Sequence, residues 1–263
     1  MRVFIAVLLL TLSGLGQAAI KTQEMPYQTA DGTKLIGYYA YDDAIKGQRP
    51  GVVVVHEWWG LNDYTKRRAR DLAALGYSAL AIDMYGDGKN TEHPKDAMAF
   101  MQAALKDADA SSARFQAGLD LLKKQAQTDP DKVAAIGYCF GGAVVLNAAR
   151  QGVPLAGVVS FHGALATNTP AEPGKVKAKI LVEHGALDSM VTPQNVAAFK
   201  SEMDKAGADY TFVSLEGAKH GFSNPDADRL GHGDHGGPDI GYNKAADDKS
   251  WADMQAFFKK LFG

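Results

Sequence analysis

Residues 137–142 read Gly-Tyr-Cys-Phe-Gly-Gly, and this stretch decides the fold. It follows an apolar run at 133–136 that is typical of a buried strand, and it precedes a run at 143–150 that is typical of a helix. Glycines two residues before and after Cys139 let strand and helix approach closely, so the spacing predicts a nucleophile elbow with sulfur as the reactive atom. The Cys139 side chain would then lie at a helix N-terminus, where the helix dipole favours thiolate over thiol.

Cys139 is the only cysteine in the chain, so it cannot form an internal disulfide. A free cysteine is often just a small buried apolar residue, and the residue type alone leaves that alternative open. The flanking glycines and the change from strand to helix favour a reactive thiol instead.

Strand-like and helix-like segments alternate along the chain on both sides of the elbow. Four consecutive valines at 52–55 indicate a strand that is buried on both faces, as in a parallel sheet. The turn at 30–33 contains Asp-Gly and predicts a hairpin between strands at 25–29 and 34–41.

The second half of the chain continues the alternation. Residues 128–131 read Thr-Asp-Pro-Asp and predict a break before the strand that leads into the elbow. Apolar residues near helical spacing predict a long final helix at 243–262. No repeat or linker divides the chain, so we expect one α/β-hydrolase-like domain over 19–263, with a mostly parallel sheet and helices on both faces.

The N-terminal residues 1–18 have the pattern of a secretory signal. Arg2 precedes an apolar run at 3–12, and small residues lead to a cleavage pattern at 16–18. The run is shorter than the ~20 apolar residues that a membrane span needs, so we expect a cleaved signal, a periplasmic or secreted protein, and no membrane anchor after cleavage. The formal net charge of −2 gives no indication of nucleic-acid binding.

Two later loops supply the partners that a nucleophilic thiol requires. In the α/β-hydrolase fold the acid and then the histidine follow the nucleophile, each in a loop after a later strand. Asp188 follows the predicted strand at 178–184, and His220 follows the one at 209–215. We therefore expect Cys139 to attack an ester carbonyl, His220 to take the thiol proton, and Asp188 to orient the imidazole.

The oxyanion that forms during such an attack needs two hydrogen-bond donors. One is expected to be the backbone N–H of Phe140, the residue after the nucleophile, and the other the backbone N–H of Trp58 in an earlier loop. The aromatic residues Trp59, Tyr85 and Phe222 indicate a substrate pocket, although each of them would also suit the core.

Five short motifs resemble those of the dienelactone hydrolase (carboxymethylenebutenolidase) family. They are His-Glu-Trp-Trp-Gly-Leu-Asn at 56–62, Asp-Met-Tyr at 83–85, the elbow at 137–142, the acid loop at 185–191 and Gly-Ala-Lys-His-Gly-Phe at 217–222. The resemblance spans about residues 25–260 and implies a Cys-His-Asp triad, a small ester or lactone substrate, no metal and no organic cofactor. It also implies that Glu57 exchanges a proton with the thiol when substrate binds.

Two positions depart from the family's pattern. Members that cleave dienelactone carry one arginine after the Asp-x-Tyr turn and another shortly after the histidine, whereas this chain has Asp87 and Asn224 there. An acid and an amide cannot form the bidentate clamp that arginine makes on a carboxylate. The resemblance therefore implies the reaction class, while an uncharged ester or lactone fits this chain as well as an acid does.

Other interpretations remain open at this point. A non-catalytic ligand-binding protein on the same scaffold is one alternative, and a thioesterase or peptidase with the same triad is another. The glycine- and histidine-rich residues 231–237 are interpreted as a surface loop rather than a metal site. Four further histidines have no assigned role: His56, His93, His162 and His184. The sequence does not predict the oligomeric state.

Overall fold

A computed structural model describes residues 20–231 and 239–263 of the chain. The predicted signal at 1–18 and all but the first residue of the loop at 231–237 lie outside the described residues, so both stay predictions. Within the described ranges, no helix combines the length and the apolar character that crossing a membrane requires.

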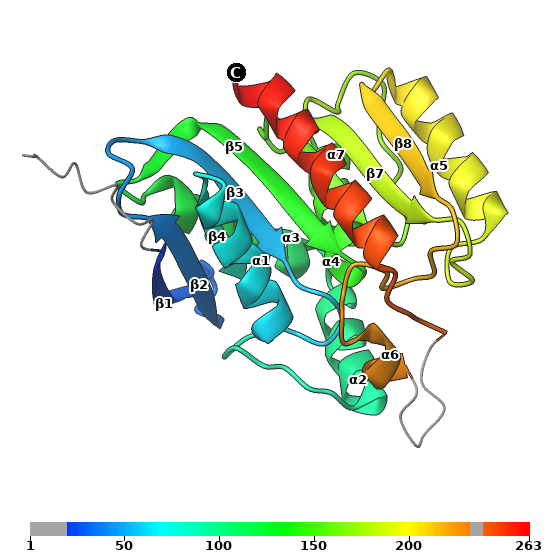
Figure 1. The fold of residues 1–263 in the computed structure, drawn as a ribbon, viewed down its shortest axis with the longest axis horizontal. Helices are drawn as coiled ribbons and strands as arrows, with labels where there is room; N and C mark the ends of the chain where they lie inside the picture. The colour runs from blue at the N-terminus through cyan, green and yellow to red at the C-terminus, as the bar shows by residue number, and fades with distance from the viewer. Residues whose placement is uncertain (1–19, 232–238) are drawn as a thin grey trace, which may run out of the picture.

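One eight-stranded sheet runs through the molecule in the order β1-β2-β4-β3-β5-β6-β7-β8 (Figure 1). Strands β3 to β8 are parallel, and the hairpin of β1 and β2 adds two antiparallel strands at one edge, as its Asp-Gly turn predicts. The strands are β1 (Ile20–Gln28), β2 (Lys34–Asp42), β3 (Arg49–Val55), β4 (Ser78–Ile82), β5 (Thr128–Tyr138), β6 (Gly157–Phe161), β7 (Lys179–Gly185) and β8 (Tyr210–Leu215).

Helices cover both faces of this sheet. Helices α1 and α7 pack on one face, and α3, α4 and α5 pack on the other (Figure 1). The helices are α1 (Asp63–Ala74), α2 (Pro94–Leu105), α3 (Ala108–Lys123), α4 (Phe140–Arg150), α5 (Pro193–Ala206), α6 (Ala227–Gly231) and α7 (Lys244–Phe262). Successive valines of β3 enter the two cores alternately, Val52 and Val54 on the α1–α7 side and Val53 and Val55 on the other. The four-valine run is therefore buried on both faces, which confirms the expected architecture.

The start of β5 differs from the expectation of a break at residues 128–131. Thr128 and Asp129 pair with Arg49 and Pro50 of β3, so the strand already begins at Thr128. The register then shifts, because the next pair joins Gly51 to Val133. The residues between, which include a proline that cannot donate to the ladder, are accommodated as a bulge. The local turn signal is real, but pairing with β3 overrides it.

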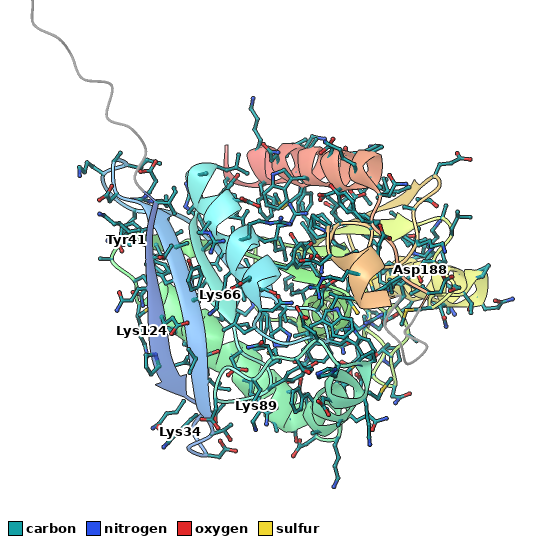
Figure 2. All side chains as sticks on the ribbon, turned by 60° about the horizontal axis from the view of Figure 1, so that its bottom comes forward. Lys34, Tyr41, Lys66, Lys89, Lys124 and Asp188 are labelled. Carbon is teal, nitrogen blue, oxygen red and sulfur yellow. The ribbon has the colours of Figure 1, made fainter. Side chains whose placement is uncertain are left out.

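The carboxyl ends of the parallel strands meet at one edge of the sheet, which is where such folds place their sites. Four polar residues directly follow these ends: His56 after β3, Asp83 after β4, Cys139 after β5 and His162 after β6. Asp188 and His220 lie in the loops that follow β7 and β8. Figure 2 shows Asp188 well apart from the β1–β2 hairpin, whose two ends are marked by Lys34 and Tyr41.

Candidate active site

Cys139 has the backbone conformation of a nucleophile elbow. It caps the N-terminus of α4 with φ 53° and ψ −114°, which is strained for a residue with a side chain. A Cβ on Gly137 would lie 2.0 Å from the carbonyl oxygen of Gly141, and one on Gly141 would lie 2.3 Å from that of Val55. These contacts explain the two glycines: β3, β5 and α4 approach so closely that no side chain fits between them.

His220 and Asp188 form a buried pair. Nδ1 of His220 lies 2.8 Å from Oδ2 of Asp188, and both side chains are almost fully excluded from solvent. The second carboxylate oxygen, Oδ1, accepts the backbone N–H groups of Met190 at 2.9 Å and Val191 at 3.2 Å. The turn after β7 therefore fixes the carboxylate, and the carboxylate fixes the imidazole.

The other edge of the His220 ring interacts with Cys139. Burial by itself would lower the pKa of His220, but the negative charge of Cys139 and the hydrogen bond with Asp188 outweigh it and raise the pKa to about 10. Nε2 of His220 is buried and meets no described acceptor in full hydrogen-bond geometry, and a weaker hydrogen bond with Cys139 is among the interactions that raise the pKa of the ring. The structure thus brings the sulfur, the imidazole and the carboxylate together, with one imidazole nitrogen free for proton transfer.

The loop after β3 is held by His56. Nε2 of His56 accepts the backbone N–H of Met84 at 3.2 Å, so Nδ1 carries the proton and donates it to the carbonyl oxygen of Glu57 at 2.5 Å. Burial lowers the pKa of His56, which keeps the ring neutral. This bond fixes the peptide between Glu57 and Trp58, so the Trp58 N–H points the opposite way.

The turn that follows β4 also helps to orient this loop. The buried carboxylate of Asp83 accepts the backbone N–H groups of Tyr85, Gly86 and Gly88, each at 2.8 Å. This turn places the Tyr85 hydroxyl so that it donates to the carbonyl oxygen of Trp58 at 3.0 Å. The peptides on both sides of Trp58 are therefore fixed by side chains from neighbouring strand ends.

The two N–H groups that we expect to bind an oxyanion remain available. Among the described hydrogen bonds, neither the backbone N–H of Trp58 nor that of Phe140 has an acceptor. Phe140 lies against the rings of His56 and Tyr85, with centroids 5.8 Å and 5.5 Å away. This packing holds the first turn of α4 against the Trp58 loop.

Glu57 is buried and contacts Asn224. The Nδ2 amide of Asn224 donates to Oε2 of Glu57 at 2.7 Å. Burial raises the pKa of Glu57 to about 7, although the Asn224 bond and the positive charge of His220 act in the opposite direction. The described contacts of this carboxylate lead to Asn224 and His220, and none of them joins it to the Cys139 sulfur.

The two positions that depart from the family's arginines have different surroundings. Asn224 is buried at the site through its bond to Glu57. Asp87 is exposed, has a positive φ of 54°, and donates its backbone N–H to the carbonyl oxygen of Lys34 at the start of β2. The structure therefore puts an amide in hydrogen-bond contact with Glu57, at the position where the family has its second arginine.

Two cations near the His220 loop are neutralised by acids. Lys219 forms an ion pair with Asp239 at 2.7 Å, and Arg229 forms one with Glu92 at 2.8 Å. Both pairs are exposed to solvent, so they are weak and easily screened. The pairing nevertheless engages two of the three side chains, Lys89, Lys219 and Arg229, that the sequence offers in place of the family's arginines; Lys89 is exposed.

Of the three predicted pocket aromatics, two are enclosed by the core. Trp59 is 1% exposed and Phe222 is fully buried, with the Phe222 ring edge-on to His162 at 5.0 Å. Tyr85 is 7% exposed, and its hydroxyl donates a hydrogen bond to the carbonyl oxygen of Trp58. A direct contact of these rings with substrate stays a prediction.

His162 is the residue that the sequence interpretation missed. The backbone N–H of Cys139 donates to Nδ1 of His162 at 3.1 Å, and Nε2 of His162 lies 2.8 Å from the hydroxyl of Ser223. Its position directly after a buried strand, as with Cys139 and His56, is a signal that could have singled it out.

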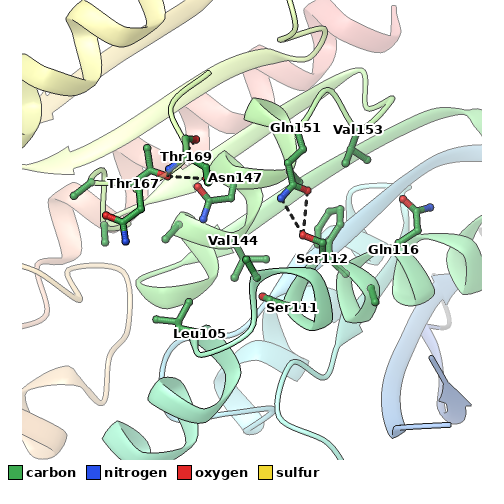
Figure 3. Close-up of a pocket in the computed structure, with 18 residues that line it drawn as sticks. Leu105, Ser111, Ser112, Gln116, Val144, Asn147, Gln151, Val153, Thr167 and Thr169 are labelled. Atoms are coloured by element: carbon green, nitrogen blue, oxygen red, sulfur yellow. Dashed lines mark hydrogen bonds between the residues drawn. The ribbon is translucent and has the colours of Figure 1, made fainter. Parts of the chain in front are cut away.

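A cavity of about 660 Å³ lies on the α3–α4 side of the sheet (Figure 3). Its lining comes mainly from α3, from α4 between Ala143 and Ala148 with Gln151 just after the helix, and from residues 164 and 166–169. All of its lining side chains are uncharged, and the labelled Ser112 and Gln151 hydrogen-bond to each other across it. It borders the helix that Cys139 caps but contains none of the three triad candidates.

Metal ligation has no support in the described part of the chain, where no group of three or more His, Cys, Asp or Glu side chains could hold an ion. The histidines and the acid of the loop at 231–237 lie outside the described residues, so the interpretation of this segment as a surface loop rather than a metal site stays a prediction.

Comparison with known proteins assigns the fold to one family. A family model described as "Dienelactone hydrolase family" matches residues 35–262. A solved dienelactone hydrolase-like promiscuous phosphotriesterase from metagenomic libraries superposes with a TM-score of 0.87 and 39% identity, covering 93% of this chain and 100% of that one.

Curated relatives align over similar lengths. "Protein usf" of Aquifex pyrophilus is 29% identical over 88% of this chain and 95% of its own length. A "Probable 2-oxo-3-(5-oxofuran-2-ylidene)propanoate lactonase" of Bradyrhizobium sp is 30% identical over 73% of this chain and 80% of its own. Because the family model spans nearly the whole described chain and the sheet has the α/β-hydrolase topology, this chain belongs to the dienelactone hydrolase family and is a hydrolase of carboxylic ester or lactone bonds.

Proposed function

We propose that Cys139, His220 and Asp188 form a catalytic triad that cleaves an uncharged ester or lactone through a thioacyl intermediate. The observation that carries this proposal is the buried His220, which bonds Asp188 at 2.8 Å and whose pKa is raised by the charge of Cys139 on a strained elbow. An imidazolium between a carboxylate and a thiolate is the arrangement that activates a cysteine nucleophile.

In the first half of the reaction, the thiolate of Cys139 attacks the carbonyl carbon, and the carbonyl π electrons move onto oxygen. The resulting oxyanion accepts the backbone N–H groups of Phe140 and Trp58, which the described hydrogen bonds leave free. The C–O bond to the alcohol then breaks while Nε2–H of His220 protonates the leaving oxygen. With a lactone, the alcohol stays attached to the acyl group.

In the second half, a water molecule hydrolyses the thioester. Neutral His220 takes a proton from the water, whose oxygen attacks the acyl carbon, and the same two N–H groups stabilise the second oxyanion. The C–S bond breaks, the acid leaves, and Cys139 returns to a thiolate beside the His220 imidazolium. Asp188 orients His220 throughout the cycle and stabilises its cation whenever the ring is protonated.

Glu57 is proposed as a second acceptor for the thiol proton. Its pKa of about 7 means that the carboxylate ionises as the pH rises through neutrality, and only the ionised form can accept a proton. We expect kcat/KM of the wild type to rise with pH near 7, and Glu57→Gln to lack this rise and to be slower by about 10²-fold. The measurement is a pH–rate profile of both proteins. A Glu57→Gln profile that still rises near pH 7 would assign the ionisation to another group.

The substrate is proposed to be uncharged around its acyl group. An amide at Asn224 cannot clamp a carboxylate as a guanidinium does, and Asp87 carries the wrong charge. Lys219 and Arg229 are engaged by acids.

A substrate panel tests this function. Purified protein is assayed with a neutral lactone, p-nitrophenyl acetate, a carboxylate-bearing lactone, an acyl thioester, a peptide and a phosphotriester, the last because of the solved relative's activity. We expect the neutral lactone and ester to give the highest kcat/KM. Preference for the carboxylate-bearing lactone would refute the uncharged class, and preference for thioester, peptide or phosphotriester would reassign the reaction. Binding without turnover would favour the ligand-binding alternative.

A further inference from the structure

Two non-glycine residues of positive φ meet at the nucleophile. Cys139 has φ 53° and His162 has φ 40°, and the only other such residue in the described chain is Asp87. The N–H of Cys139 is shared between the carbonyl oxygen of Phe161 at 3.0 Å and Nδ1 of His162 at 3.1 Å. Strained backbone of this kind persists only where surrounding contacts enforce it, and it gathers at functional sites.

The loop that carries His162 is pressed against the first turn of α4. A Cβ on Gly142 would lie 2.7 Å from Cα of Gly163, and one on Gly163 would lie 2.3 Å from the hydroxyl of Ser160. The backbone N–H of His162 donates to the carbonyl oxygen of Glu183 on β7 at 2.8 Å. The backbone of His162 is therefore held by β7, while its ring lies against the elbow.

The tautomer of His162 follows from its two partners. Because Nδ1 accepts the Cys139 N–H, it carries no proton, and the neutral ring must carry its proton on Nε2. That proton is donated to the hydroxyl of Ser223 at 2.8 Å. Burial, followed by the positive charge of His220, holds the pKa of His162 well below its usual range, so the ring stays neutral.

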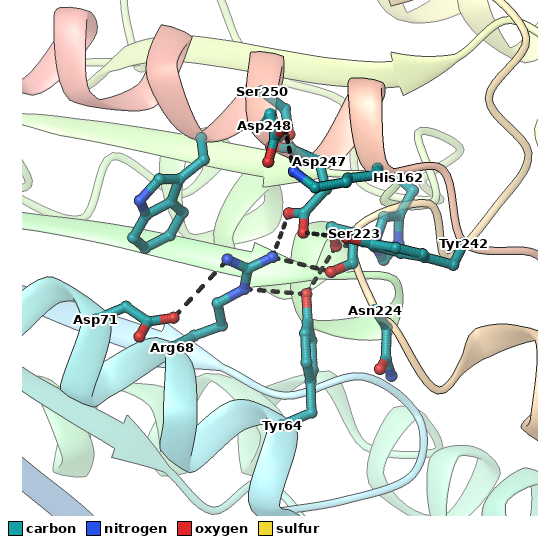
Figure 4. Close-up of polar contacts among 12 residues, drawn as sticks. Tyr64, Arg68, Asp71, His162, Ser223, Asn224, Tyr242, Asp247, Asp248 and Ser250 are labelled. Carbon is teal, nitrogen blue, oxygen red and sulfur yellow. Dashed lines mark hydrogen bonds and ion pairs between the residues drawn. The ribbon is translucent and has the colours of Figure 1, made fainter.

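Ser223 is fixed in turn by a buried network (Figure 4). Its hydroxyl lies 2.7 Å from that of Tyr64 on α1, and its carbonyl oxygen accepts a guanidinium N–H of Arg68 at 2.9 Å. Arg68 also forms an ion pair with Asp247 on α7. The acceptor for Nε2–H is therefore held by side chains from the two helices on the face opposite α4.

We propose that His162 is a positioning residue of the elbow: its Nδ1 holds the Cys139 N–H, and Ser223 fixes its ring, so that the thiol keeps the angle from which it attacks. His162 does not touch the reacting atoms in this proposal. The inference rests on the proposed role of Cys139 as nucleophile. It adds a requirement that the triad does not contain, namely an acceptor at the place of Nδ1.

A pair of substitutions separates the two bonds of the ring. In His162→Asn, the asparagine Oδ1 lies near the place of Nδ1, and asparagine tolerates positive φ. This variant therefore keeps an acceptor for the Cys139 N–H and loses the hydrogen bond to Ser223. In His162→Gln, the longer side chain reaches toward Ser223 and removes the acceptor at the place of Nδ1, so the Cys139 N–H keeps the Phe161 carbonyl alone. With p-nitrophenyl acetate we expect His162→Gln to lower kcat about 10²-fold and His162→Asn to stay within about fivefold of wild type, with KM unchanged within about twofold in both.

Urea unfolding of both variants checks that kcat does not simply follow stability. Ser78→Ala is the matched control, because it removes a buried hydroxyl bonded to Tyr39 and Thr128 at the opposite end of the parallel strands. We expect it to lose stability and keep kcat. Equal losses of kcat in His162→Asn and His162→Gln would overturn the positioning role. So would losses of kcat that simply follow the losses in the free energy of unfolding.

The wild-type protein offers a test that needs no variant to fold. Long-range proton–nitrogen NMR spectra report the tautomer of each histidine, and we expect a neutral ring with its proton on Nε2 for His162. A ring protonated on Nδ1 could not accept the Cys139 N–H and would refute the proposal. An active Cys139→Ala would instead refute the proposed function. An inactive Cys139→Ala with equally affected His162 variants would refute only the positioning role.

Discussion

Replacing Cys139 by alanine is expected to lower kcat/KM for p-nitrophenyl acetate by at least about 10⁴-fold, because no other group at the elbow can attack the carbonyl. Residual activity would come from the oxyanion donors and from binding alone. The measurement is steady-state hydrolysis together with mass spectrometry of the acylated protein. We expect an acyl adduct on the peptide that contains Cys139 in the wild type and none in the variant.

Alanine fits this position without a new side-chain contact, so the fold should survive, and circular dichroism checks that it does. Cys139→Ser is the sharper comparison, because serine has nearly the same shape and can adopt the same backbone. We expect it to lose about 10²-fold or more, since a hydroxyl holds its proton far more tightly than a thiol does. Unchanged turnover in Cys139→Ser would show that the site is not tuned for a thiolate.

Asp188→Asn is expected to lower kcat by up to about 10⁴-fold with little change in KM. The asparagine Oδ1 can still accept the backbone N–H groups of Met190 and Val191, so the turn after β7 keeps its shape. The asparagine NH₂ group that replaces Oδ2 is a donor and cannot accept the N–H of Nδ1 of His220, and it carries no negative charge. The imidazole then loses both its orientation and the stabilisation of its cation.

The pKa of His220 gives this prediction a second readout. The Asp188 carboxylate contributes to raising that pKa to about 10, so its removal must lower it. NMR titration of wild type and Asp188→Asn measures the change directly. Asp248→Asn is the matched control, because Asp248 forms an exposed ion pair with Lys244 on α7. A loss in Asp188→Asn no larger than in this control would contradict the proposed triad.

Much of the fold and the central residues of the site could be predicted because they leave local signals. The glycine spacing around Cys139 predicts the elbow, since close approach of strand and helix excludes a Cβ at Gly137 and Gly141. Asp188 and His220 were predicted because each follows a strand in fixed chain order, and strand ends of a parallel sheet meet at one edge. Four consecutive valines predicted a strand buried on both faces.

Other parts of the site could not be predicted, because they depend on contacts between residues far apart in the chain. Glu57 and Asn224 are 167 positions apart, and His162 and Ser223 are 61 apart. The resemblance singles out Glu57 and Asn224 one by one, but no spacing rule relates either of them, or His162, to its partner. The start of β5 is a similar case, because pairing with β3 overrides a local turn signal.

The sequence by itself determined which residues we propose for the chemistry: a thiol at an elbow, and an acid and a histidine in the loops after later strands. Tertiary structure alone decided how the elbow and the Glu57 loop are held, through the neutral rings of His56 and His162 and the amide of Asn224. The physical reason is that short-range sequence patterns largely determine the backbone geometry of strands, turns and helices. Tautomers and buried hydrogen bonds, in contrast, exist only once distant strands have been packed together.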